Sequence, residues 1–331
     1  MAGLNLKGAE VVLLEENFDS RVLVKSALRG MGCTSVHECR NVEGVRRRFR
    51  YFQVDLLMLD LDVDFDAACQ LIRDIRYQRL GFSWFVVIVG LTWRPMGDVI
   101  ETALAAGMDD LVKKPLTNKI LTERITNLIR NRKAFVAGPD YIGPKRAKGP
   151  GGEAAPVAHA PAVEVPNSLR RKVTGEGKAV DDSLETRRVI EEMNRKRLHS
   201  LTLELGALSG SLVARFKGAE AVFGVDVELG RLAGLTAQIT HLATYEIVKN
   251  LPKLASSMAA AMDAIMLATP PLPRQIELFH LHAQAIAAAL RGDDGAVDDV
   301  AHALNQAVER TRAAAPESSR EATGGGASGS R

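Results

Sequence analysis

Five polar side chains in the first part of the chain stand where their chemistry could combine, because each one follows a short apolar run. They are Glu15 and Glu16, Asp60, Thr92, and Lys114. Grouped carboxylates raise each other's pKa unless a cation neutralises them. Mg²⁺ prefers carboxylate, water and phosphate oxygens, so it suits this set better than metals that bind His or Cys. A carboxylate nucleophile beside a metal, a hydroxyl and an ammonium group is suited to phosphoryl transfer.

The apolar runs alternate with amphipathic segments, and this alternation predicts the elements that position the five side chains. The predicted elements are strand 11–14, helix 21–30, strand 56–59, helix 67–76, strand 85–89, helix 97–106 and helix 118–129. Continuous apolar runs between helix-period segments indicate a parallel sheet covered on both faces, which is a doubly wound α/β fold. In such folds the ligand site lies where the carboxyl ends of the strands meet.

Four blocks of sequence resemble the response-regulator receiver family, in the order and at the separations typical of that family. The resemblance covers about residues 8–132. The blocks are VVLLEEN at 11–17, VDLLMLD at 54–60, VGLT at 89–92 and AAGMDDLVKKP at 105–115. Four blocks in register are a far more specific signal than any one of them. The resemblance implies a flavodoxin-like, five-stranded parallel sheet.

The resemblance also implies a role for each polar residue. Asp60 would accept a phosphoryl group from a histidine kinase or a phosphotransfer protein, and Thr92 and Lys114 would read the phosphorylated state. The implied Mg²⁺ ligands are Glu15, Glu16, Asp60 and the main-chain carbonyl of Asp62. We therefore expect a two-component signalling protein that is not an enzyme acting on a small substrate.

Three features depart from the family pattern. Glu16 stands where receivers mostly have Asp, and its longer side chain would shift the metal by about one methylene, which Mg²⁺ tolerates badly. The loop 61–66 carries three further carboxylates, which could strengthen metal binding or repel phosphate. Leu111 replaces the usual aromatic switch residue. The alternative is therefore a phosphorylation-inert pseudo-receiver that acts as an interaction scaffold.

The rest of the chain divides by composition. Residues 1–135 form the expected receiver domain, 136–180 a Gly/Pro/Ala-rich linker, 181–313 a helical domain and 314–331 a disordered tail. The helical part has apolar residues at alternating spacings of three and four, typical of helices packed in a bundle or coiled coil. These stripes are Leu198, Leu201, Leu205, Leu208, Leu212; Leu232, Leu235, Ile239, Leu242; and Ile276, Phe279, Ala283, Ile286, Leu290.

We expect the helical domain to act through protein contacts, as a homodimer and with a partner that the sequence does not name. A further alternative is a phosphotransfer intermediate that uses a helical histidine: His302, His280 or His241. The sequence around His302 lacks the Lys and Gly that follow the histidine in phosphotransfer domains. DNA binding is not expected, because glutamates interrupt the basic segment 187–197 and no recognition helix follows it closely.

Composition supports a cytoplasmic protein. The net charge of +3 is too small to mark a nucleic-acid or membrane-surface protein. Three cysteines without CxxC spacing argue against a disulfide framework or a zinc site. No stretch approaches the roughly 20 apolar residues that a membrane-spanning helix needs.

Overall fold

The structure, a computed structural model, describes residues 4–94, 97–146, 161–176, 184–217, 224–245, 247–248, 250–268 and 270–292. The chain divides into two compact units, Met1–Arg197 and Leu198–Arg331. Each unit has its own hydrophobic core.

A five-stranded parallel sheet with the strand order β2-β1-β3-β4-β5 forms the centre of the first unit. The strands are β1 (Glu10–Leu14), β2 (Ser35–Cys39), β3 (Leu56–Asp60), β4 (Val87–Thr92) and β5 (Asp110–Lys113). The helices are α1 (Phe18–Gly30), α2 (Val42–Tyr51), α3 (Phe65–Arg76), α4 (Gly97–Ala105) and α5 (Asn118–Arg130). The predicted flavodoxin-like fold is confirmed, and each element predicted here by range overlaps an observed one.

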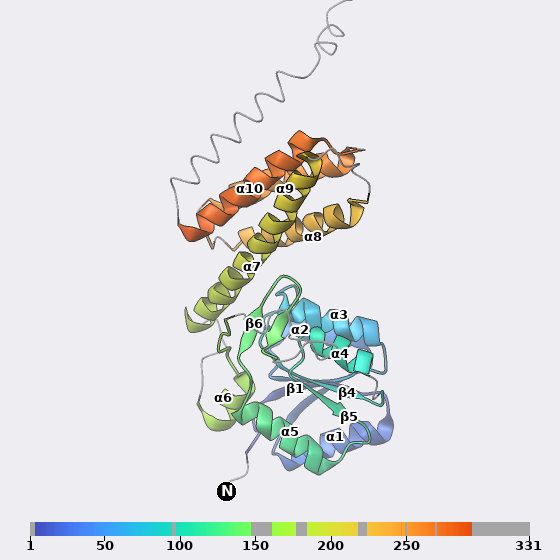
Figure 1. The fold of residues 1–331 in the computed structure, drawn as a ribbon. Coiled ribbons are helices and arrows are strands. Elements are labelled where there is room, and N and C mark those ends of the chain that lie inside the picture. Colours follow the sequence, from blue (N-terminus) through green and yellow to red (C-terminus); the bar gives the residue numbers. More distant parts are fainter. Residues whose placement is uncertain are drawn as a thin grey trace, which may run out of the picture. The chain divides into compact units, whose positions relative to one another are not determined.

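Alternate residues of the central strands build two cores, one on each face of the sheet. Val11 and Leu13 of β1 pack with residues of α1 and α5, whereas Val12 and Leu14 pack with residues of α2, α3 and α4. Figure 1 shows α1 and α5 on one face of the sheet and α2, α3 and α4 on the other. Because both faces are covered, the ends of the strands remain as the place for polar chemistry.

The described part of the predicted linker 136–180 is not an extended chain. It contains β6 (Phe135–Ala137), β7 (Ile142–Pro144) and α6 (Ser168–Thr174), and β6 pairs antiparallel with β7. Val163 exchanges main-chain hydrogen bonds with Phe135, at 2.7 and 2.8 Å. The sequence has no apolar period here because its buried residues come in isolated groups. Phe135, Val163 and Leu169 are each at most 5% exposed, so these groups fold onto the first unit.

A buried ionic network joins this extension to the sheet. Asp109 accepts from Arg76 at 2.8 Å and from Arg132 at 2.7 Å, and all three side chains are at most 5% exposed. Both guanidinium groups lie over the ring of Phe135, at 5.0 and 4.9 Å. Burial acts to raise the pKa of Asp109, but Arg132 and Arg76 outweigh it and hold that pKa below its usual range. The first unit therefore extends past α5.

Helix α7 (Leu184–Lys217) contributes its first residues to the first unit. Val189 and Met193 belong to a buried cluster with Phe85 and Phe135. Asn194 accepts a hydrogen bond from Gln78 at 3.1 Å. The predicted start of the helical domain at residue 181 therefore lies before the division into units at Arg197.

The second unit packs the remainder of α7 with α8 (Asp226–Ala243), α9 (Leu251–Leu267) and α10 (Pro273–Arg291) around one core. The leucine and isoleucine stripes predicted from the sequence lie in this core, and most of their members are fully buried. Two ion pairs join α7 to α8: Arg215 with Glu228 at 2.7 Å and Arg231 with Glu204 at 2.6 Å. The predicted tail 314–331 lies outside the described residues.

We expect the second unit to lose stability as the pH falls below about 6.5, because of the buried His282. Its Nδ1 donates to the carbonyl of Leu278 and its Nε2 accepts from Ser257, both at 2.8 Å, which suits a neutral ring. Burial lowers the pKa of His282, although the Leu278 carbonyl acts against this. Below the ordinary pKa of histidine, the imidazole of His282 is then protonated in the unfolded chain but stays neutral in the folded unit. The free energy of unfolding should fall by up to about 1.4 kcal/mol per pH unit.

Urea unfolding at several pH values, followed by circular dichroism at the helical signal, measures this effect. Trp84 and Trp93, the two tryptophans of the chain, both lie in the first unit, so their fluorescence reports that unit separately. His282→Gln keeps an acceptor for Ser257 without titrating, and it should flatten the pH dependence. An equal pH slope in wild type and this variant would contradict the assignment.

Candidate functional site

Glu15, Asp60 and Lys114 meet at the carboxyl end of the sheet. Lys114 Nζ lies 2.8 Å from Glu15 Oε2 and 2.8 Å from Asp60 Oδ2. None of the three side chains is more than 5% exposed. One buried ammonium group thus serves two carboxylates, which come from the ends of β1 and β3. This leaves one excess negative charge in a place with little water.

Burial and the neighbouring charges together raise the pKa of Glu15. Burial is the largest influence and raises the pKa of Glu15; Asp60 raises it further, and Lys114 opposes both. Glu15 Oε2 is also buried without a well-aligned hydrogen bond, although it is ion-paired. The two carboxylates would therefore favour the binding of a second cation beside Lys114. Mg²⁺ is a cation that binds to carboxylate oxygens in this way.

Local structure explains why these groups converge. The side chain of Asn17 caps α1 by accepting from the Ser20 main-chain amide at 2.9 Å. The main-chain amide of Asn17 donates to Glu15 Oε1 at 3.0 Å. Arg21 donates to the main-chain carbonyl of Glu15 at 2.9 Å. The turn after β1 thus holds Glu15 toward the sheet. On the other side, the Lys114 amide donates to the Thr92 carbonyl at 2.8 Å, which continues the β4–β5 pairing to the lysine.

The Thr92 hydroxyl is hydrogen-bonded to Asp62. It donates to Asp62 Oδ1 at 2.9 Å, and the Trp93 amide donates to Asp62 Oδ2 at 2.7 Å. The guanidinium of Arg94 lies 3.4 Å from Oδ1. The Asp62 amide in turn donates to Asp60 Oδ1 at 3.1 Å. The loops after β3 and β4 are therefore held together by a second acidic side chain.

The predicted site residues are thus only partly brought together. Glu15, Asp60 and Lys114 form one cluster, while Glu16 has an exposed side chain. Sequence reasoning assigned Asp62 a role through its main-chain carbonyl and did not predict that its carboxylate pairs with Thr92. The acidic loop was the signal that could have pointed to it, but three acidic residues there looked alike.

The metal expectation can be tested against the donor groups. Within the residues that the structure describes, no group of three or more His, Cys, Asp or Glu side chains is arranged to hold a metal ion. Glu15 and Asp60 nevertheless supply two close carboxylates, and Mg²⁺ is commonly bound by one or two carboxylates together with waters and phosphate oxygens. Glu15 and Asp60 therefore already meet what Mg²⁺ commonly takes from a protein, and Glu16 stays a predicted ligand.

The other reactive residues are placed as ordinary structural groups. Cys33 and Cys69 are buried, and burial raises the pKa of Cys69 to about 11, which disfavours the reactive thiolate. In the second unit, His280 accepts or donates hydrogen bonds with Ser209 at 2.8 Å and Gln284 at 3.0 Å. His302, the first candidate for phosphotransfer, lies outside the described residues.

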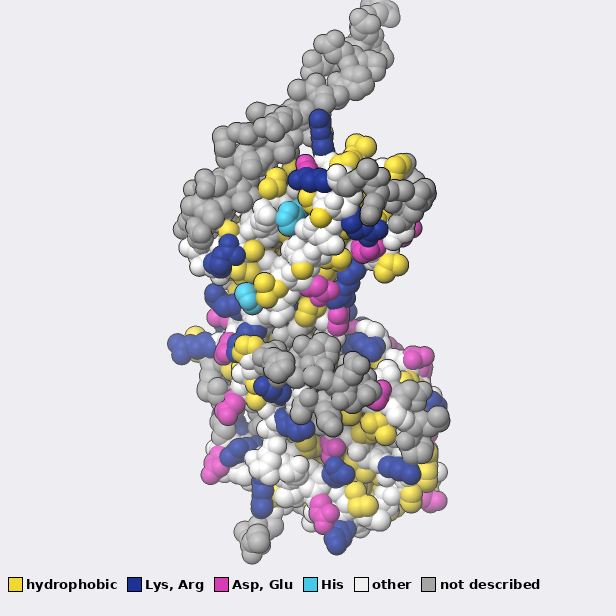
Figure 2. Space-filling model, viewed as in Figure 1, with side chains coloured by type: hydrophobic (Ala, Val, Ile, Leu, Met, Phe, Trp, Pro, Cys, Tyr) yellow, Lys and Arg dark blue, Asp and Glu magenta, His cyan; other side chains and the backbone are white. Residues whose placement is uncertain are grey.

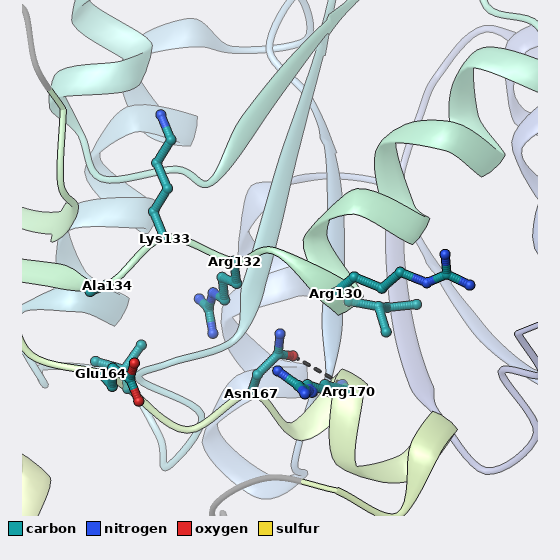
Figure 3. Close-up of a pocket in the computed structure, with 9 residues that line it drawn as sticks. Arg130, Arg132, Lys133, Ala134, Glu164, Asn167 and Arg170 are labelled. Carbon is teal, nitrogen blue, oxygen red and sulfur yellow. Dashed lines mark hydrogen bonds between the residues drawn. The ribbon is translucent and has the colours of Figure 1, made fainter.

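A hollow elsewhere in the first unit differs in character from the cluster at the carboxyl end of the sheet. It has a volume of about 150 Å³ and is lined by Arg130, Arg132, Lys133, Asn167 and Arg170 among others. Figure 3 shows that the side chains of Arg130 and Lys133 extend in different directions, away from Asn167. Arg132 is already committed to Asp109. Arg130 and Lys133 therefore do not point toward a common place in this hollow, which lies between α5 and the extension.

Charged side chains show no large single-sign field on the visible surface. Figure 2 shows basic and acidic side chains intermixed on the face that it displays. This mixing agrees with the net charge of +3. Among the described residues, no helix is both long and apolar enough to span a bilayer.

Comparison with known proteins matches the part of the chain that contains this site to a known family. Residues 11–126 match the family model described as response regulator receiver domain. The two-component response regulator PhoP of Pseudomonas aeruginosa is 32% identical over 97 residues, which are 29% of this chain and 41% of that protein. The chain thus spans about two fifths of the length of this curated relative.

Two solved structures resemble the first unit. A response regulator from Thermotoga maritima is 24% identical, with a TM-score of 0.32, and the match covers 36% of this chain and 97% of that one. The receiver domain of the sensor histidine kinase PA1611 from Pseudomonas aeruginosa PAO1 is also 24% identical, with a TM-score of 0.32. That match covers 37% of this chain and 96% of the other, whose active-site cleft coordinates a magnesium ion.

Proposed function

We propose, from the premise that residues 11–126 form a response regulator receiver domain, that Asp60 accepts a phosphoryl group from a phosphohistidine. The donor would be a histidine kinase or a phosphotransfer protein. The observation that carries the proposal is the ion pair of 2.8 Å between Lys114 and Asp60, in a cluster that Glu15 completes. A buried lysine between two carboxylates is costly unless the site has anionic chemistry to perform.

The chemical step is a direct phosphoryl transfer. A carboxylate oxygen of Asp60 attacks the phosphorus in line, and a P–O bond forms as the P–N bond to the donor histidine breaks. The bonding pair leaves with the imidazole nitrogen, which takes a proton from water. Lys114 balances the charge on the product. Glu15 and Asp60 would hold Mg²⁺, which when bound neutralises the charge on the phosphoryl oxygens.

We expect Asp60→Asn to abolish phosphoryl acceptance, because an amide oxygen is too weak a nucleophile. The full chain is incubated with acetyl phosphate and Mg²⁺, and intact mass spectrometry counts the phosphoryl groups gained. Wild type should gain one and the variant none. Asp66→Asn is the matched control, because it removes an equal charge from an exposed residue in the first turn of α3. Equal labelling of wild type and Asp60→Asn would refute the assignment.

The second unit is proposed to carry the output through protein contacts. A packed core from four described helices supports this, because such a bundle offers helix faces to a partner or to a second copy of the chain. We place the protein in the cytoplasm, as suits a receiver and three free cysteines. Size determination with and without acetyl phosphate tests whether phosphorylation changes a homodimer.

An inert receiver that acts as a scaffold remains the second candidate, and one observation favours it. The Thr92 hydroxyl, which would hold the phosphoryl group, is already bound to Asp62. The exposed Trp93 lies with its ring 5.9 Å from Lys114 Nζ, so its fluorescence should respond to events at the site. A saturable change in Trp93 fluorescence on Mg²⁺ titration supports a receiver that can be phosphorylated, whereas an unchanged fluorescence supports the scaffold.

A further inference from the structure

The carboxylate of Asp62 is bound at the end of β4 as a small anion would be. Its two oxygens accept from two different donors, the Thr92 hydroxyl at 2.9 Å and the Trp93 amide at 2.7 Å. The Arg94 guanidinium adds a positive charge 3.4 Å from Oδ1. Asp62 also follows Asp60 by two residues, and its amide donates to Asp60 Oδ1 at 3.1 Å. An anion is thus already held beside the proposed acceptor.

We propose that Asp62 is a built-in competitor of the phosphoryl group, and that a phosphoryl group on Asp60 gains Thr92 and the Trp93 amide only by displacing it. This inference rests on the proposed function, because it concerns how the same site responds to phosphate. It makes Asp62 a residue that sets how readily the receiver accepts and keeps the group.

The competition follows from the shared chemistry of the two anions. A phosphoryl group carries about −1.5 to −2 charges and three strong acceptor oxygens. It therefore requires the kind of donors that the Asp62 carboxylate occupies: a hydroxyl, a main-chain amide and a cation. An ionised carboxylate that stays near the new group also repels it. Displacement of Asp62 removes both obstacles, but it costs the hydrogen bonds that Asp62 makes.

Two separate mechanisms are thus possible for the carboxylate, and the variants separate them. Asp62→Ala removes both the charge and the acceptors, so it releases Thr92 and the Trp93 amide. Asp62→Asn removes the charge but retains an oxygen that can accept from the Thr92 hydroxyl. Asp66→Asn removes a charge from the same acidic loop, at an exposed residue. If Asp62 competes for these donors, Asp62→Ala should strengthen binding of a phosphoryl analogue most, Asp62→Asn less, and the control Asp66→Asn least.

The test uses the full chain with Mg²⁺ and beryllofluoride, a non-covalent analogue of the phosphoryl group, and follows bound fluoride by fluorine NMR. Hydrogen bonds to charged groups are strong enough that Asp62→Ala should lower the midpoint concentration of beryllofluoride by roughly tenfold to a hundredfold. Asp62→Asn should give a smaller gain, and Asp66→Asn should stay within about twofold of wild type. Tryptophan fluorescence during urea unfolding confirms that each variant is folded.

A double-variant cycle adds a second measurement. If Asp62 acts by holding the Thr92 hydroxyl, the gain from Asp62→Ala should shrink when Thr92 is also replaced by Ala. A gain of the same size in both backgrounds, or equal gains from Asp62→Ala and Asp62→Asn, would assign the effect to charge alone and overturn the inference.

The outcomes also separate this inference from the proposed function. Suppose that wild type accepts phosphate on Asp60, but that the midpoint concentration of beryllofluoride is unchanged or higher in Asp62→Ala. This result overturns the competition and leaves Asp60 as the acceptor. If wild type and all variants neither bind beryllofluoride nor gain a phosphoryl group, the proposed function fails and the inference fails with it.

Discussion

Replacing Asp109 with asparagine is expected to lower the free energy of unfolding of the first unit by about 3–5 kcal/mol. The carboxylate is the shared partner of Arg76 and Arg132, and without it two guanidinium groups stay buried with no counter-charge. Burial already lowers the pKa of Arg76 to about 10, although Asp109 acts against this. Urea unfolding followed by tryptophan fluorescence measures the change, since both tryptophans report this unit.

The neighbouring residue provides the matched control. Asp110→Asn removes the same charge at the next residue, the first of β5, but its partner Arg124 is 53% exposed and lies 3.3 Å away. Exposed ion pairs contribute about 0–1 kcal/mol, so this variant should stay close to wild type. Equal losses from the two substitutions would show that the effect belongs to the strand and not to the buried network.

Lys114→Met is expected to abolish phosphoryl acceptance and to destabilise the first unit by about 3–5 kcal/mol in the absence of Mg²⁺. The substitution removes the one ammonium group that lies 2.8 Å from both Glu15 and Asp60. The two buried carboxylates then repel each other without a cation. Mg²⁺ should therefore stabilise this variant more than it stabilises wild type, because binding to the folded state alone adds to its stability.

Lys113→Met is the control for this experiment, because Lys113 is the exposed neighbour on β5. It should retain both stability and labelling by acetyl phosphate. Mass spectrometry gives the labelling, and urea unfolding with and without Mg²⁺ gives the stability. If Mg²⁺ stabilised wild type and Lys114→Met equally, the ion would not be bound by the carboxylates that Lys114 neutralises.

Much of the first unit could be predicted because its signals are local and repeated. The apolar runs that became β1, β3 and β4 are buried on both sides, so they read as continuous hydrophobic segments. β2, α2 and β5 were not predicted by range. The two strands lie at the edges of the sheet, are only partly buried and carry polar residues. The bundle stripes were also clear, because each helix has one buried face.

The candidate site was predicted less completely, because residue spacing does not predict in which direction a side chain points in a loop after a strand. Glu15 and Glu16 are adjacent and alike in sequence, yet one is buried against Lys114 and the other is exposed. Asp62 was one of three acidic residues in a loop, and only the fold shows that its carboxylate meets Thr92. The extension after α5 was taken for a linker because Gly and Pro concealed its few apolar contacts.

That extension affects where the first unit can be cut. The family match ends at residue 126, before Arg132 and Phe135. A fragment that stops there would keep Asp109 and Arg76 but lose the second guanidinium and the ring on which both lie. A fragment that is to keep the buried network intact must therefore extend beyond the family match, at least to Phe135.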